Sequence, residues 1–206
     1  PRKRAFGLAF AVNDPFQYAS NIIENELGKL GITLTGKIRL ESKSYEGKNS
    51  DILSRYQSPE LNELLSIMMK ESDNLIADSL FKTLGASYFQ RAGNFRNGGQ
   101  AVKAILAEQG VDLENAYLAD GSGLSRHNLM SAELFMSVLN FVYKNDQQFD
   151  LLSSFSVAGI DGTLKYHKGV RGKQFKGRVI AKTGSMKGVA NLLGVVKTEQ
   201  GERLFV

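Results

Sequence analysis

The feature that most constrains the fold is the order in which two hydrophobic periodicities follow each other along the chain. Apolar residues recur at helical spacing through most of residues 16–143, whereas residues 178–206 read as a succession of short strands. Helices followed by neighbouring strands place the chain in the α/β class, in its segregated α+β form. We therefore expect a helical cluster beside an antiparallel sheet.

Capping residues and glycines predict where the helices begin and end. The pair Asp14-Pro15 supplies a cap and a first helical residue, and the helix that follows is expected to end near Gly31. Ser58-Pro59 opens a second helix, and a third is expected to close at Gly85. Further amphipathic segments cover 100–109 and 131–143.

Strands are predicted in two parts of the chain. Residues 32–40 alternate apolar side chains with polar ones or glycine, as a half-buried strand does. Near the C-terminus, strands are expected at 178–182, 188–197 and 203–206, and the turn-like 198–201 separates the last two. The last three form an antiparallel meander, and because the chain stops inside an apolar strand we expect truncation there.

Composition fits one globular domain. The chain has 206 residues, of which 42% are hydrophobic and only 3 are proline. No stretch approaches the roughly 20 apolar residues that a membrane-spanning helix needs. A first residue of Pro1 instead of Met indicates a cut chain, so a missing signal peptide says little about compartment. The absence of cysteine excludes disulfides and fits cytoplasm and periplasm equally.

Part of the formal net charge of +5 is concentrated in a basic stretch. Its first interpretation is a solvated loop face, and its second is a surface for an anionic substrate such as a cell-wall polymer. Nucleic acid comes third, because no aromatic residues are interleaved at stacking spacing and no binding motif accompanies the charge. The basic residues are Lys165, Lys168, Arg171, Lys173, Lys176, Arg178 and Lys182.

Two short motifs carry the chemistry: Ser72-Asp73-Asn74 at a helix junction and Lys182-Thr183-Gly184 at a strand end. Each alone is weak, but Ser-x-Asn followed by Lys-Thr-Gly is specific. An acyl-transfer site needs a hydroxyl that relays protons, an amide that positions the substrate, and a cation near the substrate carboxylate. Ser72, Asn74 and Lys182 supply these catalytic groups, whereas Asp73 is expected to point away and cap a helix.

The strand beyond the lysine is expected to bind substrate. Hydroxyls of Thr183 and Ser185 are suited to a terminal carboxylate, and Gly184 lets a peptide lie close along the strand. The peptide would then pair as an added strand.

Four longer runs, together with the two motifs, resemble the class C penicillin-binding proteins of the DacB type, which are D-alanyl-D-alanine carboxypeptidases/endopeptidases. This resemblance covers nearly the whole chain. The resemblance implies the penicillin-binding/serine β-lactamase-like transpeptidase fold, here incomplete at its N-terminal side. The runs are 69–78 (MKESDNLIAD), 119–128 (ADGSGLSRHN), 158–164 (AGIDGTL) and 181–189 (AKTGSMKGV).

The same resemblance implies the partners and further roles. Substrates would be the D-Ala-D-Ala stems or cross-links of peptidoglycan, processed in the periplasm without a cofactor, and β-lactams would bind. The backbone N–H of Ser185 would form half of the oxyanion hole. Arg126 and the loop before it are expected to shape the fold. Oligomeric state is not indicated.

One departure from the family pattern concerns the nucleophile. The Ser-x-x-Lys motif is expected upstream of inserted accessory domains, and the only match here is Ser79 with Lys82. If Ser72 and Ser79 share one helix, about 10 Å of axis separates them, so Ser79 is interpreted as a chance match. Residues 1–206 are thus expected to form a partial catalytic domain, about the C-terminal two-thirds of a mature enzyme.

Alternative classes are open at this point. A Ser-His-Asp hydrolase has only His127 and His167 available and lacks a Gly-x-Ser-x-Gly elbow. No metal site is expected, because there is no cysteine and no His-x-x-x-His. A non-catalytic peptidoglycan-binding module that keeps the cleft without the nucleophile is the more credible alternative to an enzyme.

Overall fold

The computed structural model describes residues 11–40 and 55–206. Contacts divide the chain into two units, Pro1–Tyr56 and Gln57–Val206. The expectation that residues 1–206 make one partial catalytic domain stays a prediction.

In the first unit, helix α1 spans Pro15–Lys29, as predicted. The Asp14 carboxylate accepts the N–H of Gln17 at 2.9 Å, and Gly31 follows the helix with φ 72°. The strand predicted at 32–40 is wrong, since no described segment pairs with these residues. Alternation reports which side chains share a face, but a strand also needs a neighbour for its backbone N–H and C=O groups.

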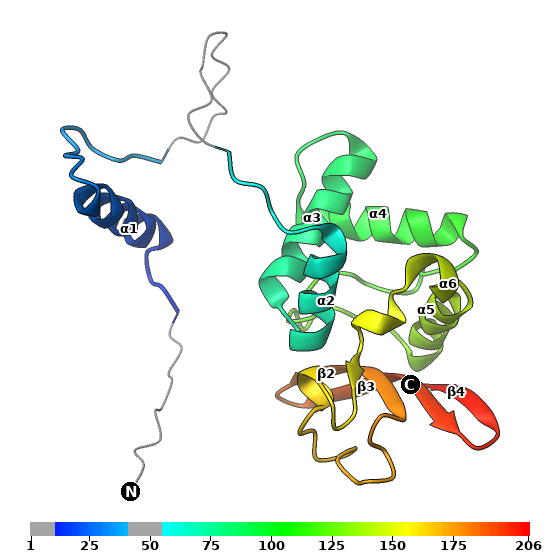
Figure 1. The fold of residues 1–206 in the computed structure, drawn as a ribbon. Coiled ribbons are helices and arrows are strands. Elements are labelled where there is room, and N and C mark those ends of the chain that lie inside the picture. Colours follow the sequence, from blue (N-terminus) through cyan, green and yellow to red (C-terminus); the bar gives the residue numbers. More distant parts are fainter. Residues whose placement is uncertain (1–10, 41–54) are drawn as a thin grey trace, which may run out of the picture. The chain divides into compact units, whose positions relative to one another are not determined.

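The second unit holds a helical cluster gathered on one side of a sheet, so the predicted fold class is confirmed (Figure 1). Helix α3 packs along α4, and α5 packs against two strands of the sheet. The elements are α2 (Leu61–Glu71), α3 (Asn74–Phe89), α4 (Phe95–Glu108), α5 (Ala132–Lys144), α6 (Asp146–Phe149) and the 3-10 turn η1 (Leu152–Ser154).

Helix α3 does not close at Gly85 as predicted but continues to Phe89. Gly85 is buried against the start of α4, where a Cβ would lie 2.4 Å from Asn97 Oδ1 and 2.6 Å from the Gly98 nitrogen. The glycine is therefore needed for the close approach of two helices and does not end one.

The sheet has four antiparallel strands in the order β1-β2-β3-β4. The short β1 (Ser156–Val157) was missed, because two residues are too few to show a period. The 3-10 turn η2 (Gly162–Leu164) and a basic connection then lead to the predicted meander of β2 (Val179–Met186), β3 (Val189–Thr198) and β4 (Gly201–Phe205).

Strand β2 is longer than predicted. Its pairing with β3 continues from Val179↔Val196 to Met186↔Val189, and Gly188 makes the turn with φ 83°. Lys182 therefore lies in the middle of a strand and not at its end. The motif is therefore paired with β3, where Leu193 lies opposite Lys182 and Asn191 lies opposite Gly184.

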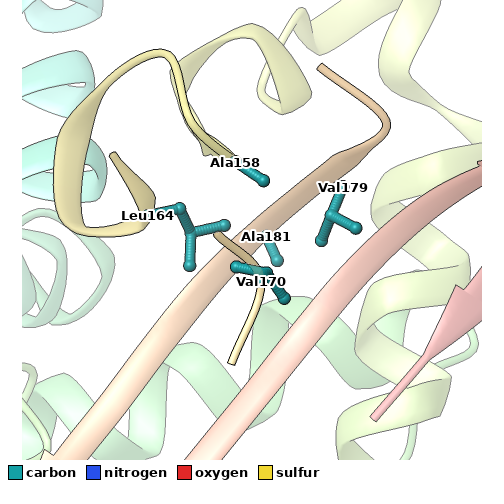
Figure 2. Packing of buried hydrophobic residues seen from close by; sticks show 5 residues of the cluster. All are labelled: Ala158, Leu164, Val170, Val179 and Ala181. Carbon is teal, nitrogen blue, oxygen red and sulfur yellow. The ribbon is translucent and has the colours of Figure 1, made fainter. Parts of the chain in front are cut away.

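A buried cluster holds the basic connection onto β2. Figure 2 shows Leu164 and Val170, from η2 and the connection, beside Ala181 and Val179 of β2. The first three are at most 8% exposed, while the charged residues between 165 and 178 are all exposed. The basic residues of this stretch other than Lys182 are thus solvated, and whether they also bind an anionic polymer stays a prediction.

Candidate active site

A left-handed residue places the first motif. Ser72 ends α2 with φ 58° and ψ 47°, a conformation that costs a residue with a Cβ roughly 1–2 kcal/mol. The Asp73 side chain then accepts the N–H of Ile76 at 2.9 Å and starts α3, which confirms its expected capping role. The kink between two helices directs Ser72 toward β2.

The side chain of Lys182 on β2 contacts Ser72 at the junction of α2 and α3. The lysine amine donates to Ser72 Oγ at 2.8 Å and to the carbonyl oxygen of Thr183 at 3.0 Å. Burial lowers the pKa of Lys182, and within residues 11–40 and 55–206 the amine forms no ion pair. Two motifs separated by 110 residues are therefore joined by a hydrogen bond from a lysine that is easier to deprotonate than usual.

Asn74 is the first residue of α3 and is exposed. Its side-chain amide forms no hydrogen bond with any part of the chain that the structure describes. Among the described residues, Lys182 therefore hydrogen-bonds to Ser72 and Thr183 but not to Asn74, whose catalytic role stays a prediction.

The residues predicted to bind substrate lie along β2. Strand β1 pairs with β2 only at Ile180 and Ala181, so among the described residues the same edge from Lys182 to Met186 has no strand partner. A Cβ at Gly184 would meet nothing closer than 3.6 Å, so the chain itself does not require glycine there. An open edge beside a glycine fits an added peptide strand.

A chain of hydroxyl groups, which the sequence interpretation missed, lies behind β2. Thr183 Oγ1 is 2.9 Å from Thr163 Oγ1, which lies 3.2 Å from Ser156 Oγ. Ser156 in turn donates to the Lys70 carbonyl at 3.2 Å. Thr163 lies within the run 158–164 and Ser156 lies two residues before it; this run contributed to the family resemblance, but the sequence analysis assigns it no chemical role.

An ion pair closes the same region. Lys70 Nζ lies 2.5 Å from Asp161 Oδ2, and the N–H of Val157 donates to Asp161 Oδ1 at 2.8 Å. Burial alone raises the pKa of Asp161, but the hydrogen bonds from Lys70 and Val157 and the nearby positive charges outweigh it and hold the pKa below its usual value. The last turn of α2 is thus tied to β1 and η2.

The loop before Arg126 is structural, as expected. Asp78 of α3 accepts the N–H groups of Gly121 and Ser122, and Arg126 donates to the Lys187 carbonyl at 2.7 Å. The loop therefore bridges α3 and the β2–β3 turn.

The side chains of Ser79 and Lys82 form no hydrogen bond with each other in the described part of the chain. Ser79 is exposed on α3, and Lys82 Nζ lies 4.9 Å from the centre of the Phe95 ring. Ser72 precedes α3 and does not share its axis, so the expected spacing of Ser72 and Ser79 along one helix was wrong. The interpretation of Ser79 as a chance match stays a prediction.

The described ranges contain neither a group of three or more side chains suited to a metal ion nor a helix long and apolar enough to cross a membrane. His127 and His167 are both exposed.

Comparisons with known proteins identify relatives of the chain. The chain is 44% identical over 201 residues to D-alanyl-D-alanine carboxypeptidase DacB of Haemophilus influenzae, covering 98% of this chain and 41% of that protein. It is 34% identical to a D-alanyl-D-alanine carboxypeptidase of Actinomadura sp. strain R39, covering 94% of this chain and 36% of that one.

A crystal structure of penicillin binding protein 4 (dacB) from Haemophilus influenzae, complexed with a novel beta-lactam, superposes with a TM-score of 0.89 at 44% identity. The match covers 97% of this chain and 46% of that one. The chain thus spans less than half the length of these relatives, not two-thirds as expected. The model of the D-Ala-D-Ala carboxypeptidase 3 (S13) family matches residues 1–206, and the chain belongs to that family.

Proposed function

We propose that the whole protein is a serine-type D-Ala-D-Ala carboxypeptidase/endopeptidase that acts on peptidoglycan stem peptides and is acylated by β-lactams. The observation that carries the proposal is the hydrogen bond from Lys182 to Ser72 Oγ at 2.8 Å. It places a proton-relaying hydroxyl and a cation side by side next to an open strand edge. These are groups that acyl transfer to and from a serine needs.

Each residue then has a role in the proposed reaction. Lys182, with its pKa lowered by burial, exchanges a proton with Ser72, whose hydroxyl passes it to the leaving group. Asn74 orients the substrate amide. The N–H of Ser185 supplies one donor to the oxyanion, and the exposed edge of β2 holds the peptide backbone.

The nucleophile is proposed to come from a Ser-x-x-Lys elsewhere in the whole protein. Support comes from the length of the relatives, which is more than twice the part that this chain covers. The match of Ser79 with Lys82 does not compete, because Lys82 lies over the Phe95 ring.

Substrate and compartment follow from the family. Its name specifies D-Ala-D-Ala, and one related structure holds a β-lactam. Peptidoglycan stems carrying D-Ala-D-Ala are therefore the proposed substrate class. Because that polymer lies outside the cytoplasmic membrane, the proposed location is the periplasm.

The test is penicillin labelling of the full-length protein, followed by intact-mass analysis and digestion. One adduct is expected, on a serine outside residues 1–206, together with release of D-alanine from a D-Ala-D-Ala pentapeptide. The 206-residue chain alone should bind penicillin only reversibly. A full-length protein that forms no adduct and releases no D-alanine would contradict the proposal and would leave the peptidoglycan-binding module as the better description.

A further inference from the structure

The hydroxyl chain behind β2 has a direction that the structure fixes. The Lys70 carbonyl can only accept, so Ser156 donates to it. A hydroxyl has one hydrogen, so Thr163 must donate to Ser156, and Thr183 must donate to Thr163. In this arrangement the hydrogen of Thr183 points inward, and only the lone pairs of its oxygen can face a ligand.

Ser156, at the inner end of the series of hydroxyl groups, is fixed by burial and by backbone hydrogen bonds. Ser156 is 0% exposed, and its Oγ also accepts the N–H of Thr163 at 3.1 Å. At Gly162, which has φ 52°, a Cβ would lie 2.3 Å from Ser156 Oγ and 2.6 Å from the Lys70 carbonyl oxygen. Any side chain there would push η2 away from α2.

The outer end can reverse without moving a heavy atom. A carboxylate is a stronger acceptor than a neutral hydroxyl, so a substrate carboxylate would draw the Thr183 hydrogen outward. Thr163 can then rotate its own hydrogen from Ser156 to Thr183. The bond that is given up is the long one of 3.2 Å, while the 2.9 Å contact is kept with the donor and acceptor exchanged.

We infer that Thr163 is a positioning residue that accepts the hydrogen of Thr183 in the arrangement described above and donates to Thr183 when a substrate carboxylate is bound. Ser156 does not change its hydrogen bonds to the Lys70 carbonyl and the Thr163 N–H between these two arrangements. The inference deepens the proposed function and rests on it. Since Thr163 supports Thr183 only through its hydroxyl, its effect falls on carboxylate binding and not on the acylation step.

The test is Thr163→Val in the full-length protein, which keeps the shape and removes the hydroxyl. Benzylpenicillin acylation by stopped flow separates the reversible binding constant from the acylation rate constant. The variant loses the hydrogen bond from Thr163 to Thr183, the residue that donates to the substrate carboxylate. Reversible binding should therefore weaken about five- to ten-fold, while the acylation rate constant should change less than about two-fold. Thr163→Ser should restore binding, and Thr83→Val, at an exposed hydroxyl of α3, is the matched control.

The outcomes separate the inference from the function on which it rests. Absence of acylation in the parent protein would overturn both. An acylated parent with a Thr163→Val variant that binds equally well would overturn the inference alone. So would a variant in which binding and acylation fall together with the melting temperature, because that pattern indicates a merely structural residue. Failure of Thr163→Ser to recover binding would have the same meaning.

Discussion

Replacing Lys182 by alanine in the full-length protein should lower β-lactam acylation by at least about 100-fold. The lysine amine makes two hydrogen bonds, at 2.8 Å to Ser72 Oγ and at 3.0 Å to the Thr183 carbonyl. A hydrogen bond to a charged group contributes about 1.5–3 kcal/mol, and 100-fold in rate corresponds to about 2.7 kcal/mol. The lost contact to Ser72 is by itself of the required size.

The stability of the parent should also depend on the protonation of Lys182. The pKa of Lys182 is lowered by burial, so the folded chain binds fewer protons than the unfolded chain between the two pKa values. Stability therefore rises as the pH rises through that window, and at neutral pH the buried charge has a cost. The melting temperature of the parent should therefore rise relative to that of Lys182→Ala as the pH approaches the ordinary lysine pKa of about 10.4.

Stopped-flow acylation and thermal melting of the same samples decide the matter. Lys187→Ala is the control, since Lys187 is exposed on the same hairpin and only its backbone carbonyl is used, by Arg126. A Lys182→Ala protein that stays folded and reacts within about ten-fold of the parent would refute the role assigned to the lysine.

Three further results are expected. Ser79→Ala should leave acylation unchanged, and a penicillin adduct mapped to the peptide containing Ser79 would overturn this. Because the pKa of Asp161 is lowered, the stability advantage of the parent over Asp161→Asn should be complete above the ordinary pKa of about 3.9 and disappear as the pH falls through the folded pKa, which urea unfolding at several pH values measures. Gly85→Ala should destabilise by about 1–3 kcal/mol through overpacking, whereas Gly28→Ala, with nothing within 4 Å, should gain a few tenths to about 1 kcal/mol; equal melting shifts would contradict the packing argument.

Periodicity predicted the helices and the C-terminal meander well, because both depend on a single face that recurs in the sequence. Periodicity failed where the structure of a segment depends on contacts with residues elsewhere in the chain. Residues 32–40 alternate like a strand but have no neighbour in the described chain, and Gly85 reads as a helix end although it serves contact with Asn97. Neither partner can be identified from the local pattern.

The two motifs identified Ser72 and Lys182 as candidate site residues. They gave neither the distance between the two side chains nor the kink between α2 and α3 that directs Ser72 toward Lys182. The sequence places the motif at a helix junction with Asp73 as the cap, but the left-handed conformation of Ser72 cannot be read from it. Burial of Lys182 and the resulting direction of its pKa shift are also tertiary properties. The sequence therefore predicted that Ser72 and Lys182 belong to one site, and the fold sets the hydrogen bond between them.

The residues that hold the two motifs together were beyond sequence reasoning for a different reason. Ser156 lies 86 residues after Lys70 and 7 before Thr163, which lies 20 before Thr183. Serine and threonine at such separations carry no periodic signal, and only the passage of β1, η2 and β2 beside the end of α2 aligns them. The Asp161-Gly162 pair is the one local hint, since the aspartate pairs with Lys70 and the glycine has φ 52°. A substitution at Gly162 would therefore disturb the geometry between Lys182 and Ser72 without touching either motif.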